Sequence, residues 1–128
     1  MAPTNHPSLI ALSREHHTAL VMSARIVGLT GNLTAQSEMC EFLFERHSTE
    51  FEAHIEDEEN RIFPPLLGTH EKLVLRALED HAVLRKLVRR IAACDCAALM
   101  WFGEKLVEHV RFEERELFPL YEALIGDN

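Results

Sequence analysis

Cysteine, proline and glycine are scarce in this chain of 128 residues, and each shortage narrows the choice of fold. Three cysteines, an odd number without a Cys-x-x-Cys pair, argue against a disulfide framework and against a zinc ribbon. Most of the glycines and prolines lie near the termini or at two interruptions, residues 28–32 and 64–68. The segments between these breaks are long enough for extended helices.

Positive charge is also in short supply, because the chain has a formal net charge of -8. Nucleic-acid-binding proteins need basic surfaces that neutralise phosphates, and anionic membranes attract basic segments. The apolar run 97–103 is too short to span a bilayer, and residues 1–8 lack the basic and apolar regions of a signal peptide. We therefore expect a cytoplasmic protein with neither a nucleic-acid nor a membrane partner.

Apolar residues recur at three- and four-residue intervals through the long segments, and no useful length alternates as a strand would. This pattern predicts four helices, at about 7–29, 34–63, 69–93 and 95–119 or one turn beyond. The connections are short, so neighbouring helices should be antiparallel. We expect an all-α, antiparallel up-down-up-down four-helix bundle, forming one domain over 1–128 with its core at about 8–122.

Local signals refine this expectation. Thr69 and Asp95 are predicted as the N-caps of the third and fourth helices. The segment from Cys94 to Cys96 is interpreted as the turn between them, with a redox or metal role as the alternative. Cys40 should be a buried, small apolar residue. The predicted inward apolar residues are Leu9, Leu12, Leu20, Val27, Phe44, Phe51, Ile55, Ile62, Val74, Leu78, Leu84 and Ile91, with Trp101, Phe102, Phe112 and Tyr121 in the core or at helix ends.

One motif occurs twice, as His-x3-Glu-Glu-x3-Phe-Pro at residues 54–64 and again at residues 109–119. Each copy falls near the end of a predicted long helix. An acidic residue followed by a histidine precedes each copy, at residues 15–16 in the first predicted helix and 80–81 in the third. The order of these groups is therefore His, His-x3-Glu, His, His-x3-Glu.

The spacing places the polar residues of each motif on one helix face. Residues four apart lie one above the other, so His54 and Glu58 can point into the bundle together, as can His109 and Glu113. His81 lies about 12 residues before the last connection and His109 about 13 after it, so they should meet at one height. Buried unpaired polar groups cost several kcal/mol, and metal ions remove that cost by making them ligands.

The donor set indicates which metal is expected. Two carboxylates between two pairs of imidazoles suit two ions, with each glutamate bridging both. Imidazole binds iron, copper, zinc and nickel, and a mixed nitrogen and oxygen set suits non-haem iron. The sequence has neither the Glu-x-x-His of ferritin-like di-iron proteins nor the His-Glu-x-x-His of metalloproteases. It also lacks a nucleophile–base pair that would indicate an ordinary enzyme class.

These motifs resemble the hemerythrin-like (HHE cation-binding) family, from about Leu9 to Tyr121. The resemblance implies an antiparallel four-helix bundle around two non-haem iron ions, oxo- or hydroxo-bridged, with Glu58 and Glu113 bridging both. One ion would be held by His54 and a histidine of the first helix. The implied metal ligands are His16 or His17, His54, Glu58, His81, His109 and Glu113.

The third helix departs from the oxygen-carrying hemerythrins, which place two histidines four residues apart there. Ala77 and Arg85 stand four residues before and after His81. One ion would therefore lack a third imidazole and have an open coordination position. This feature favours reactivity or sensing over reversible oxygen transport.

Several neighbouring positions have more than one interpretation. The pairing with Glu15 and the position of Leu12 favour His16 as the ligand of the first helix, whereas the spacing to Leu20 favours His17; we prefer His16. His6 and His70, near helix starts, are interpreted as surface or satisfied core residues and not as ligands. His47 is interpreted as a core or bundle-end residue, or as a further ligand. Glu50 is an outer or spare ligand or a solvated residue, and Glu56, Asp57 and Glu59 are placed on a solvated acidic face.

The resemblance implies a protein that binds or reacts with dioxygen, nitric oxide or peroxide. The alternative is an iron sensing, storage or delivery module without turnover. A third reading is an interaction bundle whose metal site is vestigial. The sequence leaves open whether the protein is an enzyme.

Overall fold

The structure, a computed structural model, describes residues 6–125, and nearly all of them are helical. The predicted all-α class is confirmed. The elements are α1 (Pro7–Val27), α2 (Leu33–Asp57), the π-helix η1 (Glu58–Ile62), the 3-10 helix η2 (Pro64–Leu66), α3 (Glu71–Ala92), α4 (Cys96–Phe112), the π-helix η3 (Glu113–Leu117) and α5 (Phe118–Ile125).

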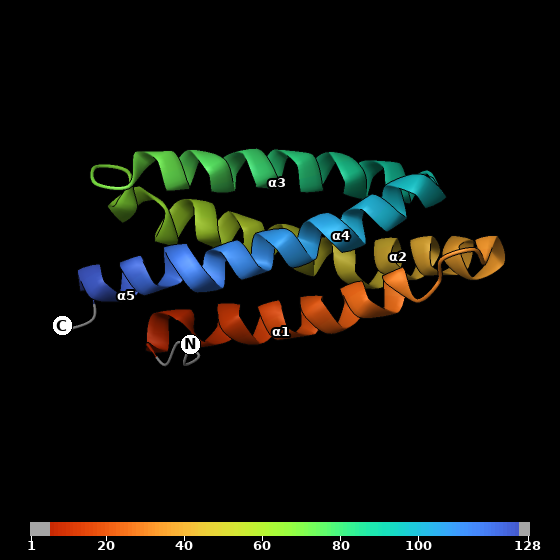
Figure 1. The fold of residues 1–128 in the computed structure, drawn as a ribbon, viewed down its shortest axis with the longest axis horizontal. Coiled ribbons are helices and arrows are strands. Elements are labelled where there is room, and N and C mark those ends of the chain that lie inside the picture. The colour runs from red at the N-terminus through yellow and green to blue at the C-terminus, as the bar shows by residue number, and fades with distance from the viewer. Residues whose placement is uncertain (1–5, 126–128) are drawn as a thin grey trace.

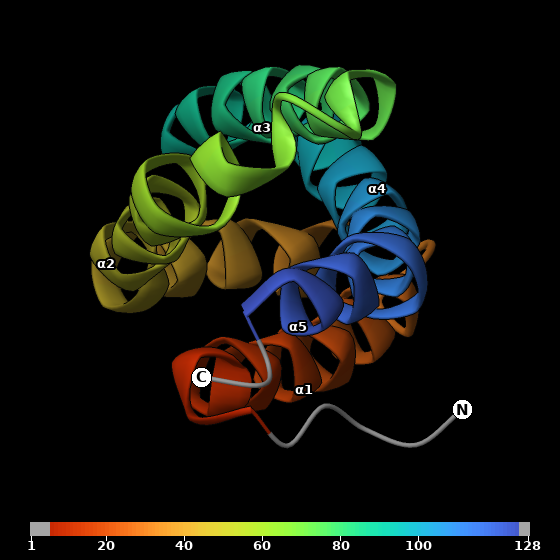
Figure 2. The same cartoon turned by 90° about the vertical axis from the view of Figure 1, so that its left-hand side faces the viewer.

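These elements form four rods, because α2 continues into η1 and α4 continues through η3 into α5. Figure 1 shows α1 and α3 running in one direction, with α2 and α4 running back beside them. Figure 2 looks along the rods and shows them arranged around a shared interior. The α1 helix contacts α4 more extensively than it contacts α2. No helix within residues 6–125 is both long and apolar enough to cross a membrane.

Side-chain caps begin three of the helices. The side chains of His6, Asn32 and Asp95 each accept a hydrogen bond from a backbone N–H in the first turn, at 3.1, 3.0 and 3.1 Å. Such caps satisfy backbone donors that have no partner within the helix. The predicted Asp95 cap is therefore confirmed.

The predicted Thr69 cap is wrong, because α3 begins two residues later, at Glu71. The backbone N–H groups of Thr69 and His70 both donate to the carbonyl oxygen of Leu66, at 3.3 and 2.7 Å. These bonds hold the chain in the preceding turn until His70, which takes the cap position without a side-chain hydrogen bond.

Buried apolar side chains form two clusters with a polar layer between them. In α3, Ala77 belongs to the first cluster and Leu84 to the second, and His81 lies between them. The first cluster contains Leu9, Leu12, Ile62, Phe63, Leu66, Val74, Ala77, Phe112, Leu117, Phe118 and Tyr121. The second contains Ile26, Cys40, Leu43, Leu84, Leu87, Ile91, Ala98, Leu99, Phe102, Leu106 and Val110.

Two predicted core positions are displaced by one residue. Val27 and Phe44 are exposed, and their neighbours Ile26 and Leu43 are buried instead. One residue corresponds to about 100° of helix rotation, enough to turn a side chain from the core to solvent. Trp101 is also exposed and therefore does not pack in the core, but its ring lies 5.6 Å from the guanidinium carbon of Arg90 in the last turn of α3.

Candidate metal centre

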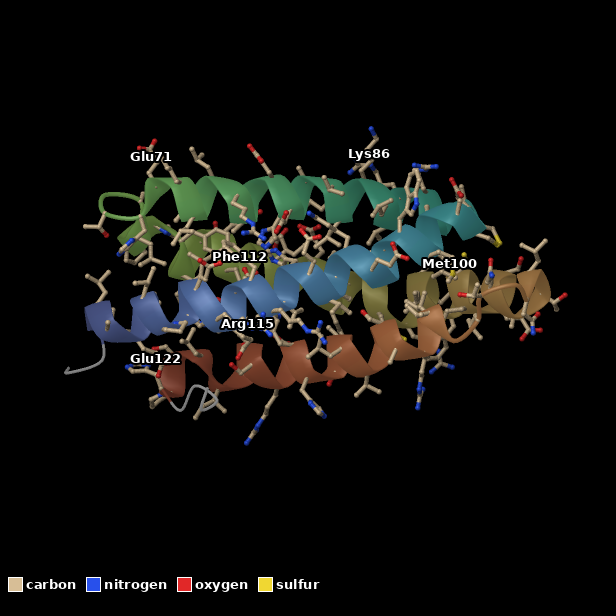
Figure 3. The ribbon with its side chains drawn as sticks, in the orientation of Figure 1. Glu71, Lys86, Met100, Phe112, Arg115 and Glu122 are labelled. Atoms are coloured by element: carbon tan, nitrogen blue, oxygen red, sulfur yellow. The ribbon has the colours of Figure 1, made fainter. Side chains whose placement is uncertain are left out.

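Six polar side chains meet inside the bundle, in the layer between the two apolar clusters. Five of them are buried, and His54 is partly buried. Figure 3 shows nitrogen and oxygen atoms concentrated inside the bundle beside the labelled Phe112, whose ring lies 6.5 Å from that of His109. The six residues are His16 from α1, His54 from α2, Glu58 from η1, His81 from α3, His109 from α4 and Glu113 from η3.

These side chains form two overlapping groups, each with its ligand atoms within 4.8 Å of one another. One group contains His16 and His54, and the other contains His81 and His109. Glu58 and Glu113 belong to both groups. A shared pair of carboxylates between two pairs of imidazoles is the arrangement that the motif spacing predicted.

Glu58 turns one oxygen toward each pair of histidines. Its Oε2 lies 3.3 Å from Nε2 of His16 and 3.1 Å from Nε2 of His54. Its Oε1 lies 2.9 Å from Nε2 of His81. The carboxylate therefore spans the two groups.

Glu113 also directs one oxygen toward a histidine of each group. Its Oε1 lies 3.0 Å from Nε2 of His16, and its Oε2 lies 3.2 Å from Nε2 of His109. The Nε2 atoms of His81 and His109 are 3.1 Å apart, so the predicted meeting of these two histidines at one height is confirmed. All four imidazoles thus direct Nε2 toward the two carboxylates.

The other ring nitrogen of each histidine contacts a carboxylate. The Nδ1 atoms lie 2.7 to 2.9 Å from these oxygens, close enough to fix the orientation of each ring. Histidines that bind metals commonly have such a partner on the second nitrogen. The four pairs are His16 with Glu114, His54 with Glu15, His81 with Glu59 and His109 with Asp80.

The sequence places Glu15 and Asp80 directly before His16 and His81, but the structure pairs them with His54 and His109. Sequence reasoning placed Glu59 on a solvated face and gave Glu114 no role. The sequence contains a signal for both, because each motif copy has two consecutive glutamates at the same offsets. The first glutamate of each pair points into the centre. The second reaches the histidine of α1 or α3.

The phenylalanine of each motif copy also has a defined role. Phe63 stacks on His81 with ring centroids 5.3 Å apart, and Phe118 stacks on His16 at 5.0 Å. A π-helical turn begins at each central glutamate, and the amides of Phe63 and Phe118 donate to the carbonyl oxygen five residues earlier. Such widened turns occur frequently at functional sites.

The proline that follows explains these widened turns. Proline lacks the N–H of a regular helical hydrogen bond, and its ring clashes with the carbonyl four residues earlier. Pro64 and Pro119 each follow a π-helical turn after one residue, the phenylalanine of the motif. The repeated Phe-Pro therefore sets the backbone that carries both glutamates.

The four carboxylates that contact the Nδ1 atoms are called the outer carboxylates below. Two of them also form ion pairs with basic side chains. The Nη1 atom of Arg85 donates to Oε2 of Glu59 at 2.9 Å, and Nζ of Lys105 lies 2.8 Å from Oδ1 of Asp80. Arg85 stands one turn after His81. It therefore supports the ring of His81 through Glu59 and does not enter the centre.

In the metal-free chain, the histidines and glutamates of the centre stabilise each other's charged forms. Burial lowers the pKa of His81, but the nearby carboxylates of Glu113 and Glu58 outweigh it and raise that pKa to about 10. Burial likewise opposes the charged form of His109, yet Glu113 and Asp80 raise its pKa to about 9. Burial opposes the charged form of both glutamates, and the charge of Glu113 also opposes that of Glu58. The histidines outweigh these effects and hold the pKa values of Glu58 and Glu113 below the usual range.

Some of the central atoms nevertheless have no hydrogen-bond partner among the described residues. These are both carboxylate oxygens of Glu113 and Nε2 of His16, all of them buried; they lie 3.0 and 3.2 Å from their nearest imidazole or carboxylate atoms, but without the angles of a hydrogen bond. A buried polar atom without a partner is costly, and in native structures it commonly marks an ion or water site. The orphaned atoms are oxygen and imidazole nitrogen donors, so the residues present fit a metal ion.

Other candidate residues lie outside the two groups. His17 is exposed, whereas its neighbour His16 is buried and faces the centre. His47 is half-buried with Nδ1 3.8 Å from Oε2 of the exposed Glu50, and neither belongs to the groups. The structure therefore brings His16 and not His17 to the other five predicted residues.

The position that would hold a further histidine on α3 is apolar. Ala77 is fully buried in the first apolar cluster, and Leu12 occupies the corresponding place one turn before His16. Each group thus contains two histidines. In the group of His81 and His109, Ala77 therefore supplies no third imidazole.

A cavity of about 270 Å³ adjoins the centre on the side opposite Ala77. Its walls include His16, Glu58 and His81 of the centre, and Leu43 and Ile91 of the second apolar cluster. Most of the lining is apolar, with polar residues of α1 and α2 among the rest. The centre is thus connected to an apolar space inside the bundle.

A helical bundle whose interior presents two overlapping groups of imidazole and carboxylate donors defines a cation-binding protein. The sequence comparison gives the family. The hemerythrin HHE cation-binding domain matches residues 8–121, and the chain belongs to this family. The resemblance inferred from the motifs is confirmed. No match was found among curated proteins or among solved structures.

The raised pKa values predict how the stability of the metal-free protein depends on pH. An unfolded histidine has a pKa of about 6.5, so the stabilisation from charged His81 and His109 is complete below that pH. It should be lost as the pH rises through about 9 and about 10, the pKa values in the folded chain. We expect the free energy of unfolding to fall by more than about 1.4 kcal/mol, the equivalent of one pKa unit.

Urea denaturation of chelator-treated protein between pH 6 and pH 10 would measure this loss. The variant His81→Gln should show a smaller slope, because it removes one of the two groups. Stability that is constant or rises over this range in the unaltered protein would contradict the prediction.

Proposed function

We propose that this protein holds two non-haem iron ions inside the bundle, as an oxo- or hydroxo-bridged pair. The buried oxygens of Glu113 are the observation that carries the proposal, because they lack hydrogen-bond geometry to their neighbours and two metal ions would take them as ligands. The proposed ligands are His16 and His54 for one ion, His81 and His109 for the other, and Glu58 and Glu113 for both.

The donor chemistry supports iron over its competitors. Each group offers two imidazole nitrogens and two carboxylate oxygens, a mixed set typical of non-haem iron sites. Structural zinc sites usually have four ligands of their own, whereas here the two groups share their carboxylates. Carboxylates shared between two groups suit two ions that lie close together, because one carboxylate can then bind both ions.

We further propose that the iron pair binds or reacts with dioxygen, nitric oxide or peroxide. Two histidines per group leave coordination positions for an added ligand. The apolar cavity supports access by a small molecule of low polarity, because its volume far exceeds the roughly 30 Å³ that one water occupies in the liquid. Iron when bound would supply the redox chemistry, and the chain would supply orientation, charge and access.

The same proposal includes two broader expectations. The three cysteines are free thiols, which agrees with a reducing, cytoplasmic environment. The family match over residues 8–121 agrees with one domain that occupies nearly the whole chain.

Anaerobic reconstitution with ferrous iron tests the function directly. We expect about two irons per chain, because the two groups share their bridging ligands. Admission of dioxygen, nitric oxide or peroxide should then change the near-ultraviolet and visible absorption. Fewer than two bound irons, or no optical response to any of the three ligands, would contradict the proposal.

The rate of iron release separates the alternative function from the proposed one. A module for iron sensing, storage or delivery should surrender its metal rapidly to a chelator. The buried ligands, each held by an outer carboxylate, lead us to expect slow release. Rapid and complete release without any optical response would favour the alternative.

Removal of an outer carboxylate tests whether the histidines are held as metal ligands. We expect Glu59→Gln to lower iron affinity by about 10–100-fold, since it weakens the contact that orients His81. Glu56→Gln removes the same charge from an exposed position on the same helix and should leave affinity unchanged. Competition with a coloured chelator measures both variants. Equal affinities would show that Glu59 is irrelevant to metal binding.

A further inference from the structure

Three thiols meet at one end of the bundle, away from the metal centre. Cys40 belongs to α2, Cys94 lies in the turn between α3 and α4, and Cys96 is the first residue of α4. Ser37, one turn before Cys40 on α2, contacts both of the others. Its carbonyl oxygen is 3.9 Å from Sγ of Cys94, and its Oγ is 3.6 Å from Sγ of Cys96.

The backbone holds Cys94 in a conformation that glycine normally adopts. Its φ of 61° is the one positive value found at a non-glycine residue within the described part of the chain. The N–H groups of Cys94 and Asp95 donate back to the carbonyl oxygens of Ile91 and Arg90, which closes the end of α3. Glycine is the usual residue at such a helix end. A cysteine there places an exposed thiol against α2.

Cys40 is the buried member of the group. Its exposed fraction is 1%, and it packs in the second apolar cluster. Burial, together with the neighbouring thiols of Cys94 and Cys96, raises the pKa of Cys40 to about 12. Both neighbours are thus close enough to influence Cys40, while Cys94 is exposed to reagents in solvent.

We propose that Cys94 and Cys40 are an oxidisable pair, which hydrogen peroxide converts into an intrachain disulfide joining α2 to the α3–α4 turn. The proposal does not depend on the iron site, because it needs only the thiols and the peroxide. Cys94 is the entry point, since it is exposed and lies in the turn. Cys40 is the partner, since Ser37 brings its helix face against that turn.

The chemistry proceeds in two balanced steps. The Cys94 thiolate attacks one peroxide oxygen, the O–O bond breaks, and the departing oxygen leaves as water after taking up a proton. The sulfur of Cys94 is thereby oxidised to a sulfenic acid. The Cys40 sulfur then attacks the Cys94 sulfur, and the hydroxyl group leaves as a second water with the Cys40 proton. One peroxide is reduced while two thiols become one disulfide.

The crosslink would lie close to the lining of the cavity. Leu43 and Ile91 are among the lining residues, and each stands three residues from one of the paired cysteines. The disulfide would therefore tie together two segments that contribute to the cavity wall.

Peptide mapping of the full-length protein tests the pairing. Reduced protein as purified is treated with one equivalent of hydrogen peroxide, quenched with catalase, alkylated, digested without reduction and analysed by mass spectrometry. We expect a monomer that loses two of its three alkylatable thiols and yields a peptide in which Cys40 is linked to Cys94.

Two single-cysteine variants test which thiol pairs with Cys40. Cys94→Ser should abolish the linked peptide, whereas Cys96→Ser should retain it and serves as the matched control. A Cys40–Cys96 link, a disulfide between two chains, or oxidation of Cys94 to sulfinic acid without any link would each overturn the proposal. Circular dichroism of Cys94→Ser, expected to match the unaltered protein, separates loss of the thiol from loss of the fold.

Discussion

The repulsion between two buried carboxylates is the constraint on which the rest of this structure depends. Glu58 and Glu113 lie at the centre of a four-helix bundle with no exposure to solvent. Two like charges in an apolar interior are unstable unless cations or metal ions accompany them. The four histidines, the outer carboxylates that orient them and the two apolar clusters on either side all surround this pair.

The twice-used motif describes the whole arrangement. In each copy the histidine and the first glutamate face the centre, the second glutamate bonds a histidine of α1 or α3, and the phenylalanine stacks on that same histidine. The two halves of the chain thus hold each other's histidines: Glu59 supports His81, and Glu114 supports His16. Neither half can complete the centre alone, so the site exists only in the assembled bundle.

Much of this arrangement was predictable from the sequence, because helical periodicity and a repeated spacing act over short distances. The helices, the Asp95 cap and the meeting of His81 with His109 follow from rise and rotation per residue. Glu59 was misplaced because an acidic run normally faces solvent, and only contacts across the bundle distinguish it. The prediction that Val27 and Phe44 are buried was wrong, because periodicity alone does not distinguish neighbouring positions on a long helix.

The cavity and the orphaned atoms were beyond sequence reasoning, because both depend on how side chains from four helices fill a shared space. The orphaned atoms support metal binding, and the cavity supports access by a small ligand. These two features are the basis for proposing a redox-active iron pair. X-ray absorption at the iron edge of the reconstituted protein tests that claim most directly. Sharing of Glu58 and Glu113 predicts an iron neighbour within about 4 Å of each iron. A spectrum with nitrogen and oxygen neighbours but no iron neighbour would contradict the account.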